Sequence, residues 1–223
     1  MKDPYEKLLS RKRKWTPVKP TAGAFKHGAE ETIRRALAIR HMELPVGEFI
    51  KEGLEKDVPK NARKLLEDNV VDEIRHDIAL QYIVDAHGAD TKAENEAMRL
   101  RDAWIAHPDH TITKALVAER AIFFVLLPFF RFTGDPALRT VSADISRDEQ
   151  IHVATNSLVC RELGLVPSNS LDKLRKATIS WVLQPLKTSP DKHLDKSFWL
   201  DASDRLMYEG KAPQFADTKA ARM

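Results

Sequence analysis

The chain has little cysteine, few glycines and no long apolar run. Its single cysteine, Cys160, excludes an internal disulfide, a cysteine-rich zinc cluster and the dithiol pair of a redox enzyme. The longest apolar stretch, Ala121 to Phe130, has ten residues, about half of the roughly 20 that a membrane-spanning helix needs. Residues 1–5 also lack the apolar core of a secretion signal. We therefore expect a cytoplasmic protein without a membrane segment.

The composition favours one helical domain. Of the 223 residues, 43% are hydrophobic and 31% are charged, which is typical of a globular protein and excludes disorder of the whole chain. Only 8 residues are glycine, apolar residues recur at helical spacing, and alternating stretches are almost absent. The sequence therefore predicts an all-α fold.

Proline, glycine and capping residues mark the helix ends. Thr91 with Glu94 predicts a capping box, and Asp135 followed by Pro136 predicts another helix start. The expected helices cover about 29–53 (interrupted by Pro45), 59–87, 91–106, 110–133, 136–163 and 171–184. Four of them are long and one is a short connector, so we expect a four-helix bundle with a connector helix and a C-terminal helix. The bundle would occupy 23–186, between a basic arm at 1–22 and a partly flexible tail at 187–223.

The positive charge is concentrated at the N-terminus. Within the first twenty residues, seven lysines and arginines face two acids, which gives this segment +5 in a chain whose net charge is +3. Such a segment is either a solvated charge run or a contact for phosphate or an acidic partner. No basic face interleaved with aromatics follows, so we expect no direct nucleic-acid binding.

Two Glu-x-x-His motifs carry the chemistry. Glu73 and His76 lie in the second long helix, and Glu149 and His152 lie in the last one. Residues at i and i+3 project from one helix face, so each pair can chelate a metal ion. A single motif of this kind is more often a surface ion pair, so further ligands are needed to support a metal site.

A dinuclear site also needs a carboxylate from each of the other two long helices. Glu119 stands in the most apolar stripe of the chain, where an unpaired charge would be costly. On the first helix, Glu43 has apolar neighbours on its face whereas Glu48 has charged ones, so Glu43 is predicted to point inward.

The spacing of the six residues supports the same site. Glu43 and Glu73 are 30 residues apart, as are Glu119 and Glu149, and the second set follows the first by 76 residues. Two helix hairpins of equal reach would bring four carboxylates and two imidazoles to one level. Hard carboxylate ligands and a coordination number above four favour iron or manganese over zinc. The expected cofactor is therefore an Fe/Fe, Mn/Fe or Mn/Mn centre.

This ligand set is similar to the ferritin-like dimetal carboxylate pattern. Within it, residues 147–152, Arg-Asp-Glu-Gln-Ile-His, resemble the Arg-Asp-Glu-x-x-His signature of ribonucleotide reductase small subunits. Residues 15–17, Trp-Thr-Pro, resemble the Trp-x-Pro segment before the first bundle helix of that family. The resemblance spans about 15–163. It implies that Asp148 binds a ligand histidine and that Trp15 lies on the route of an electron to the metal.

The family places a radical tyrosine four residues after the first ligand histidine, and here that residue is Leu80. Tyr82 is the nearest tyrosine, either a radical site or a packed aromatic. The family also has a flexible C-terminus with a relay tyrosine, a position that Tyr208 matches unless it is an ordinary tail aromatic. Cys160 is interpreted as a small core residue.

The resemblance implies the small subunit of a class I type ribonucleotide reductase. As a homodimer, it would supply an oxidising equivalent to a separate large subunit that makes deoxyribonucleotides for DNA replication. One cysteine in the whole chain fits this division, because nucleotide reduction needs several. The alternative is a stand-alone dimetal oxygenase or oxidase acting on a small molecule. Iron storage and a metal-free helical module are weaker alternatives.

Overall fold

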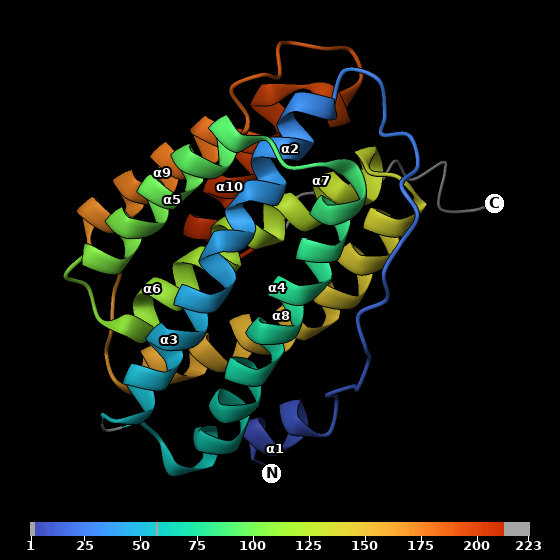
Figure 1. Ribbon diagram of the computed structural model, residues 1–223. Coiled ribbons are helices and arrows are strands. Elements are labelled where there is room, and N and C mark those ends of the chain that lie inside the picture. The colour runs from blue at the N-terminus through green and yellow to red at the C-terminus, as the bar shows by residue number, and fades with distance from the viewer. Residues whose placement is uncertain (1–2, 57, 212–223) are drawn as a thin grey trace.

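The structure is a computed structural model that describes residues 3–56 and 58–211, and Figure 1 shows its course. Helices form almost all of its regular structure, and the described residues contain no strand beyond an isolated bridge between Lys187 and Asp195. The predicted all-α fold is confirmed. None of the helices in these two ranges is long and apolar enough to span a membrane.

Fourteen helical segments follow one another along the described chain. They are α1 (Pro4–Leu9), α2 (Glu30–Ala38), η1 (Ile39–Met42), α3 (Glu43–Leu54), η2 (Lys60–Ala62), α4 (Arg63–His87), α5 (Thr91–Ala106), α6 (Thr111–Ala118), η3 (Glu119–Phe123), α7 (Phe124–Thr133), α8 (Pro136–Glu162), α9 (Asn169–Val182), η4 (Lys192–Leu194) and α10 (Lys196–Glu209). The η segments are 3-10 turns, except η3, which is a π-helical turn.

Four long rods form the bundle. The rod made of α2, η1 and α3 packs on α4, and the rod made of α6, η3 and α7 packs on α8. Cross-contacts of α3 with α6 and of α4 with α8 close the square (Figure 1). Helix α5 connects the two halves, and α9 and α10 pack on the outer side of the rod made of α6, η3 and α7. The fold is therefore a ferritin-like four-helix bundle, as expected.

The first rod is interrupted just before Pro45. Pro45 has no N–H to donate to the carbonyl of His41, so a regular α-helix cannot run through this turn. The structure resolves the conflict with the 3-10 turn η1, after which α3 begins at Glu43. Pro45 then lies in the first turn of α3, where a missing N–H costs little.

Two predicted helix starts have different outcomes. Helix α5 begins at Thr91, but its cap is Asp90, whose carboxylate accepts hydrogen bonds from the N–H groups of Lys92 and Ala93. The capping box assigned to Thr91 was wrong by one residue, because aspartate is an equally good cap and stands first. Asp135 caps α8 as predicted, through the N–H of Leu138.

Asp135 also ties distant segments together. Its carboxylate accepts hydrogen bonds from the N–H of Gly23 and from the ring of His87, at 2.8 and 3.0 Å. Burial opposes its ionisation, but the N–H groups of Leu138 and Gly23 and the contact with His87 outweigh burial and lower its pKa. The ionised side chain therefore stabilises the folded state.

We expect Asp135→Ala to reduce the free energy of unfolding by about 2 kcal/mol at neutral pH, because a cap and a buried acceptor are lost. A lowered pKa means that this stabilisation is present above the ordinary aspartate pKa and is lost as the pH falls through the folded value. Urea unfolding at pH 7 and at pH 3 measures the difference, which should shrink at pH 3. Asp144→Ala, which removes a partly exposed acid paired with Arg147 on the same helix, is the control and should change little.

The N-terminal segment is fixed to the bundle. Tyr5 and Leu8 of α1 are buried, and the Tyr5 hydroxyl donates a 2.8 Å hydrogen bond to Glu162 at the end of α8. At the other end of the chain, α10 buries Trp199 and Leu206. The part of the predicted tail at 187–211 thus contains a packed helix, and residues 212–223 lie outside the described residues.

Candidate metal centre

Six side chains meet in the middle of the bundle. Each is at most 1% exposed, and each comes from one of the four rods. They are Glu43 of α3, Glu73 and His76 of α4, Glu119 of η3, and Glu149 and His152 of α8. The structure therefore brings together all six residues that the motif and spacing argument selected.

The two histidines turn the same ring nitrogen toward the carboxylates. Nδ1 of His76 lies 3.3 Å from Glu149 and 3.7 Å from both Glu43 and Glu73. Nδ1 of His152 lies 3.0 Å from Glu73, 3.6 Å from Glu149 and 3.9 Å from Glu119. Glu73 and Glu149 are thus common to both histidines, while Glu43 and Glu119 each approach one. The arrangement is that of two adjacent sites sharing two carboxylates.

The polar atoms of this cluster fit metal ions. They form two groups, and within each group one atom per residue lies within 4.8 Å of the others. Both oxygens of Glu73 and Glu149, one oxygen of Glu43 and Glu119, and Nδ1 of both histidines are buried without a hydrogen-bond partner. Buried polar atoms without partners are costly. Two divalent cations would satisfy them and would balance the charge of four carboxylates, so these residues suit a dinuclear centre.

Helix geometry sets the level of the cluster. The i, i+3 spacing on α4 and α8 places each Glu above its His on the inner face. On the second rod, the π-helical turn begins at Glu119, and such turns insert an extra residue into a helix, frequently at functional sites. On the first rod, Gly47 faces Glu73, where a Cβ would lie 3.4 Å from the Glu73 Cβ, so α3 and α4 are close together at the level of the cluster.

Burial shapes the ionisation of the glutamates. It raises the pKa of Glu43 and Glu119 well above the usual value. Burial also opposes charge on Glu73, but the adjacent imidazoles of His152 and His76 outweigh it and lower that pKa. The two shared and two single carboxylates therefore differ electrostatically before any cation is added.

Each histidine is held from behind by an aspartate. Nε2 of His76 lies 3.3 Å from Asp148 and Nε2 of His152 lies 3.0 Å from Asp72. Burial opposes the ionisation of Asp148, but hydrogen bonds from His76 and Trp15 bring its pKa to about 2. Asp72 likewise has a lowered pKa, because His152 and Lys12 outweigh its burial. An ionised aspartate at Nε2 leaves the lone pair of Nδ1 directed at the centre.

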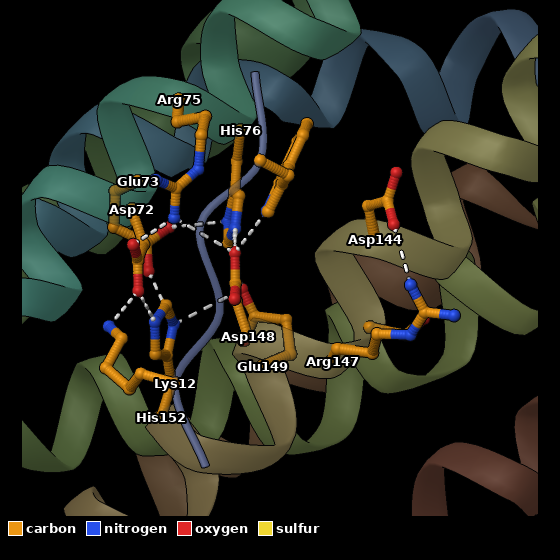
Figure 2. Close-up of polar contacts among 12 residues, drawn as sticks. Lys12, Asp72, Glu73, Arg75, His76, Asp144, Arg147, Asp148, Glu149 and His152 are labelled. Atoms are coloured by element: carbon orange, nitrogen blue, oxygen red, sulfur yellow. Dashed lines mark hydrogen bonds and ion pairs between the residues drawn. The ribbon is translucent and has the colours of Figure 1, made fainter. Parts of the chain in front are cut away.

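The two aspartates behind the histidines, Asp72 and Asp148, are contacted by basic side chains, as Figure 2 shows. Arg75 donates to Asp72 and also to Asp148, the latter at 3.2 Å. Lys12 of the N-terminal segment donates to Asp72. These contacts fix both histidine rings, since each ring is oriented by a carboxylate that is itself restrained.

Trp15 lies against the His76 side of the centre. Its indole N–H donates a 2.7 Å hydrogen bond to Asp148, and its ring stacks near that of His76 with centroids 6.2 Å apart and planes 18° apart. Arg75 covers the indole at 5.1 Å from the ring centroid. Trp15 is half-buried, so it connects the cluster with the surface.

Tyr82 and Tyr208, the two tyrosines selected from the sequence, lie away from the six buried residues. Leu80 is buried in α4. Tyr82 is half-buried on the same helix, and the ammonium of Lys19 lies 5.5 Å from its ring centroid. Tyr208 is exposed on α10, and its hydroxyl donates a 2.6 Å hydrogen bond to Asp172 of α9. Neither tyrosine has a hydrogen bond to the six buried residues among the described contacts.

Asp72, Lys12 and Arg75 were missed by reasoning from the sequence. For Asp72 a signal existed: residues 72–76 read Asp-Glu-Ile-Arg-His and residues 148–152 read Asp-Glu-Gln-Ile-His, again 76 positions apart. The two segments, which carry the metal-ligand motifs and lie 76 residues apart, thus form an internal repeat that includes Asp72 and Asp148. Lys12 had no such signal, because its contact with Asp72 spans 60 residues of chain.

Comparison with known proteins supports the fold. No protein-family model matches the sequence, and no curated protein matches it. One solved structure similar to the chain is that of a protein from Bacillus halodurans described as a "putative class I ribonucleotide reductase". It has 13% sequence identity and a TM-score of 0.61, and the match covers 92% of this chain and 88% of that one. This likeness, together with the helix packing, identifies the chain as a ferritin-like all-α bundle.

Proposed function

We propose that this chain is the metal-containing small subunit of a class I type ribonucleotide reductase. In this role it supplies an oxidising equivalent to a separate large subunit, which converts ribonucleotides to deoxyribonucleotides. A bound iron or manganese pair supplies the redox chemistry, held by Glu43, Glu73, His76, Glu119, Glu149 and His152. The similar protein from Bacillus halodurans supports this choice among the functions of the fold.

The observation that carries the proposal is the chain of contacts from Trp15 to Asp148 to His76. The 2.7 and 3.3 Å contacts are continuous and end at Nδ1 of His76, inside the cluster. Iron storage has no need of such a connection, whereas a subunit that oxidises a residue in another chain must exchange an electron with its surface. Trp15 is the half-buried group through which that electron would pass.

Asp148 and Arg75 set the electrostatics of this route. The carboxylate accepts the indole proton in a hydrogen bond and stabilises positive charge that develops on the ring when an electron leaves. Arg75, on the ring face, opposes that charge. The balance confines oxidation of Trp15 to conditions in which a strong oxidant is present at the centre.

The route is confined to one side. Asp72 and Asp148 occupy equivalent positions in the internal repeat, but Asp72 accepts from Lys12 and Asp148 accepts from Trp15. An ammonium group cannot carry an electron hole, whereas an indole can. The oxidising equivalent would therefore leave past His76 and not past His152.

Nucleotide reduction is assigned to a different chain. Cys160 is the single cysteine of the sequence, and burial raises its pKa to about 11, so it is an inert thiol at neutral pH.

A homodimer of the small subunit is favoured by the outer face of α4, where Val71, Ile74 and Ile78 are 59%, 49% and 39% exposed. An apolar stripe of this kind is suited to burial against a second copy.

The test is to mix metal-loaded protein with ribonucleotide reductase large subunits and to measure deoxynucleotide formation. We expect no activity from this chain alone and activity with a cognate large subunit. Magnetic resonance of the activated protein should be the same for Tyr82→Phe as for the wild type, since Leu80 stands at the usual radical position. Oxidation of a small molecule by the purified chain, with no stimulation by any large subunit, would overturn the proposal in favour of an oxygenase.

A further inference from the structure

A cleft of about 440 Å³ opens where α6, η3, α8, α9 and α10 meet. Its walls are mostly apolar. The residues used below are Leu116, Val117, Arg120, Ser157, Arg161 and Met207. This volume lies within the range of small-molecule sites, and an apolar lining with a few placed polar groups is their usual composition.

Arg120 brings an uncompensated charge to this cleft. Its guanidinium is half-buried and donates a 2.6 Å hydrogen bond to the Ser157 hydroxyl. Among the described residues, no carboxylate lies within ion-pair distance of it, and burial lowers its pKa despite the opposing effects of Cys160 and Glu119. Arg161 is exposed and lines the same cleft. A partly buried cation without a carboxylate partner favours an anion in the space that it faces.

The contact between Arg120 and Ser157 at the cleft lies next to a contact between Glu119 and Asn156 at the candidate metal centre. The Asn156 amide donates a 2.7 Å hydrogen bond to Glu119, and the next residue of each segment forms the Arg120–Ser157 contact. Both links join the π-helical turn η3 to α8. An anion that draws Arg120 away from Ser157 would therefore exert a force on the π-helical turn η3, which also positions Glu119.

We infer that this cleft binds a small amphipathic carboxylate. The carboxylate accepts from Arg120, with Arg161 at the rim, and the apolar body packs on Leu116, Val117 and Met207. Asp172 also lines the cleft but is paired with Arg175 and Lys176, so the half-buried Arg120 is left to pair with one anionic group of a ligand. The ligand class is therefore a singly charged organic acid.

The experiment is calorimetric titration of the metal-free full-length protein with octanoate, octanol and acetate. Octanoate is expected to bind with one molecule per chain and at least about tenfold more tightly than octanol or acetate, because only octanoate offers both the charge and the apolar body. Equal binding of octanol and octanoate, or no saturable binding of octanoate, would overturn the inference.

Variants locate the site. Arg120→Gln, which retains an N–H donor for Ser157, should weaken octanoate binding about tenfold. Arg205→Gln removes the same charge from α10 outside the cleft lining and should bind as the wild type does. If circular dichroism shows that Arg120→Gln is unfolded, the exposed Arg161→Gln takes its place and should weaken binding about threefold. Unchanged affinity in folded Arg120→Gln or in Arg161→Gln contradicts the inference. The titration uses no metal and no partner, so its result is independent of the reductase assay.

Discussion

The Trp15→Phe variant is expected to retain its metal ions and to lose turnover with a large subunit by roughly a hundredfold or more. Phenylalanine preserves most of the packing of the ring against His76 but lacks the indole N–H that binds Asp148. It is also much harder to oxidise than tryptophan. Metal content by elemental analysis, association with the large subunit and deoxynucleotide formation should be measured on the same samples.

Trp181 offers a matched control for this variant. Its indole N–H also donates a 2.7 Å hydrogen bond to a carboxylate, that of Glu96, but on α9 and outside the metal cluster. Trp181→Phe should therefore keep both metal and turnover. If Trp15→Phe drives the large subunit as well as Trp181→Phe does, electrons do not pass through Trp15 and the route proposed here is wrong.

The second large effect is expected at Glu119. The wild-type chain should take up close to two equivalents of iron or manganese, because its polar atoms form two adjacent groups. Glu119 belongs to one of those groups, opposite His152. Removing its carboxylate in Glu119→Ala leaves too few ligands at that position, and we expect the variant to lose at least one equivalent. Reconstitution under anaerobic conditions followed by elemental analysis gives the number.

Glu48→Ala is the control for a lost carboxylate. Glu48 is exposed on α3 and faces Lys51 instead of the bundle interior, so the variant should bind metal as the wild type does. Full occupancy in Glu119→Ala, measured beside this control, would remove Glu119 from the ligand set. A gain in melting temperature on metal addition that is smaller in Glu119→Ala than in Glu48→Ala would support the assignment independently.

The helical bundle could be predicted from the sequence because its signals are local. Gly88 ends α4 with a positive φ of 83°, and Asp135 with Pro136 opens α8, so both ends were visible in the residue types. The convergence of the six buried residues was also within reach. It follows from i, i+3 geometry on two helices and from hairpins of equal length, and neither argument needs a contact between distant residues.

Features that depend on distant contacts could not be predicted. The π-helical turn at Glu119 has no residue signature, since proline and glycine are absent from residues 119–123. Lys12 stands in a run of four basic residues, 11–14, and nothing local separates it from Arg11 or Arg13. Its selection by Asp72 requires the folded surfaces of α4 and α8. The packing of α10 likewise depends on a distant contact, that of Trp199 with Phe129 of α7.

The attachment of the N-terminal segment has a consequence for the order of folding. A ribosome releases residues 3–20 first, yet their partners arrive last: Tyr5 bonds to a residue 157 positions later and Trp15 to one 133 positions later. Contacts that close such long loops carry the largest entropic cost and are expected to form after the local helix hairpins. The bundle would then assemble while the outer sides of His76 and His152 are still uncovered. Newly made protein would thus have a period in which ions reach the interior before the tryptophan seals it.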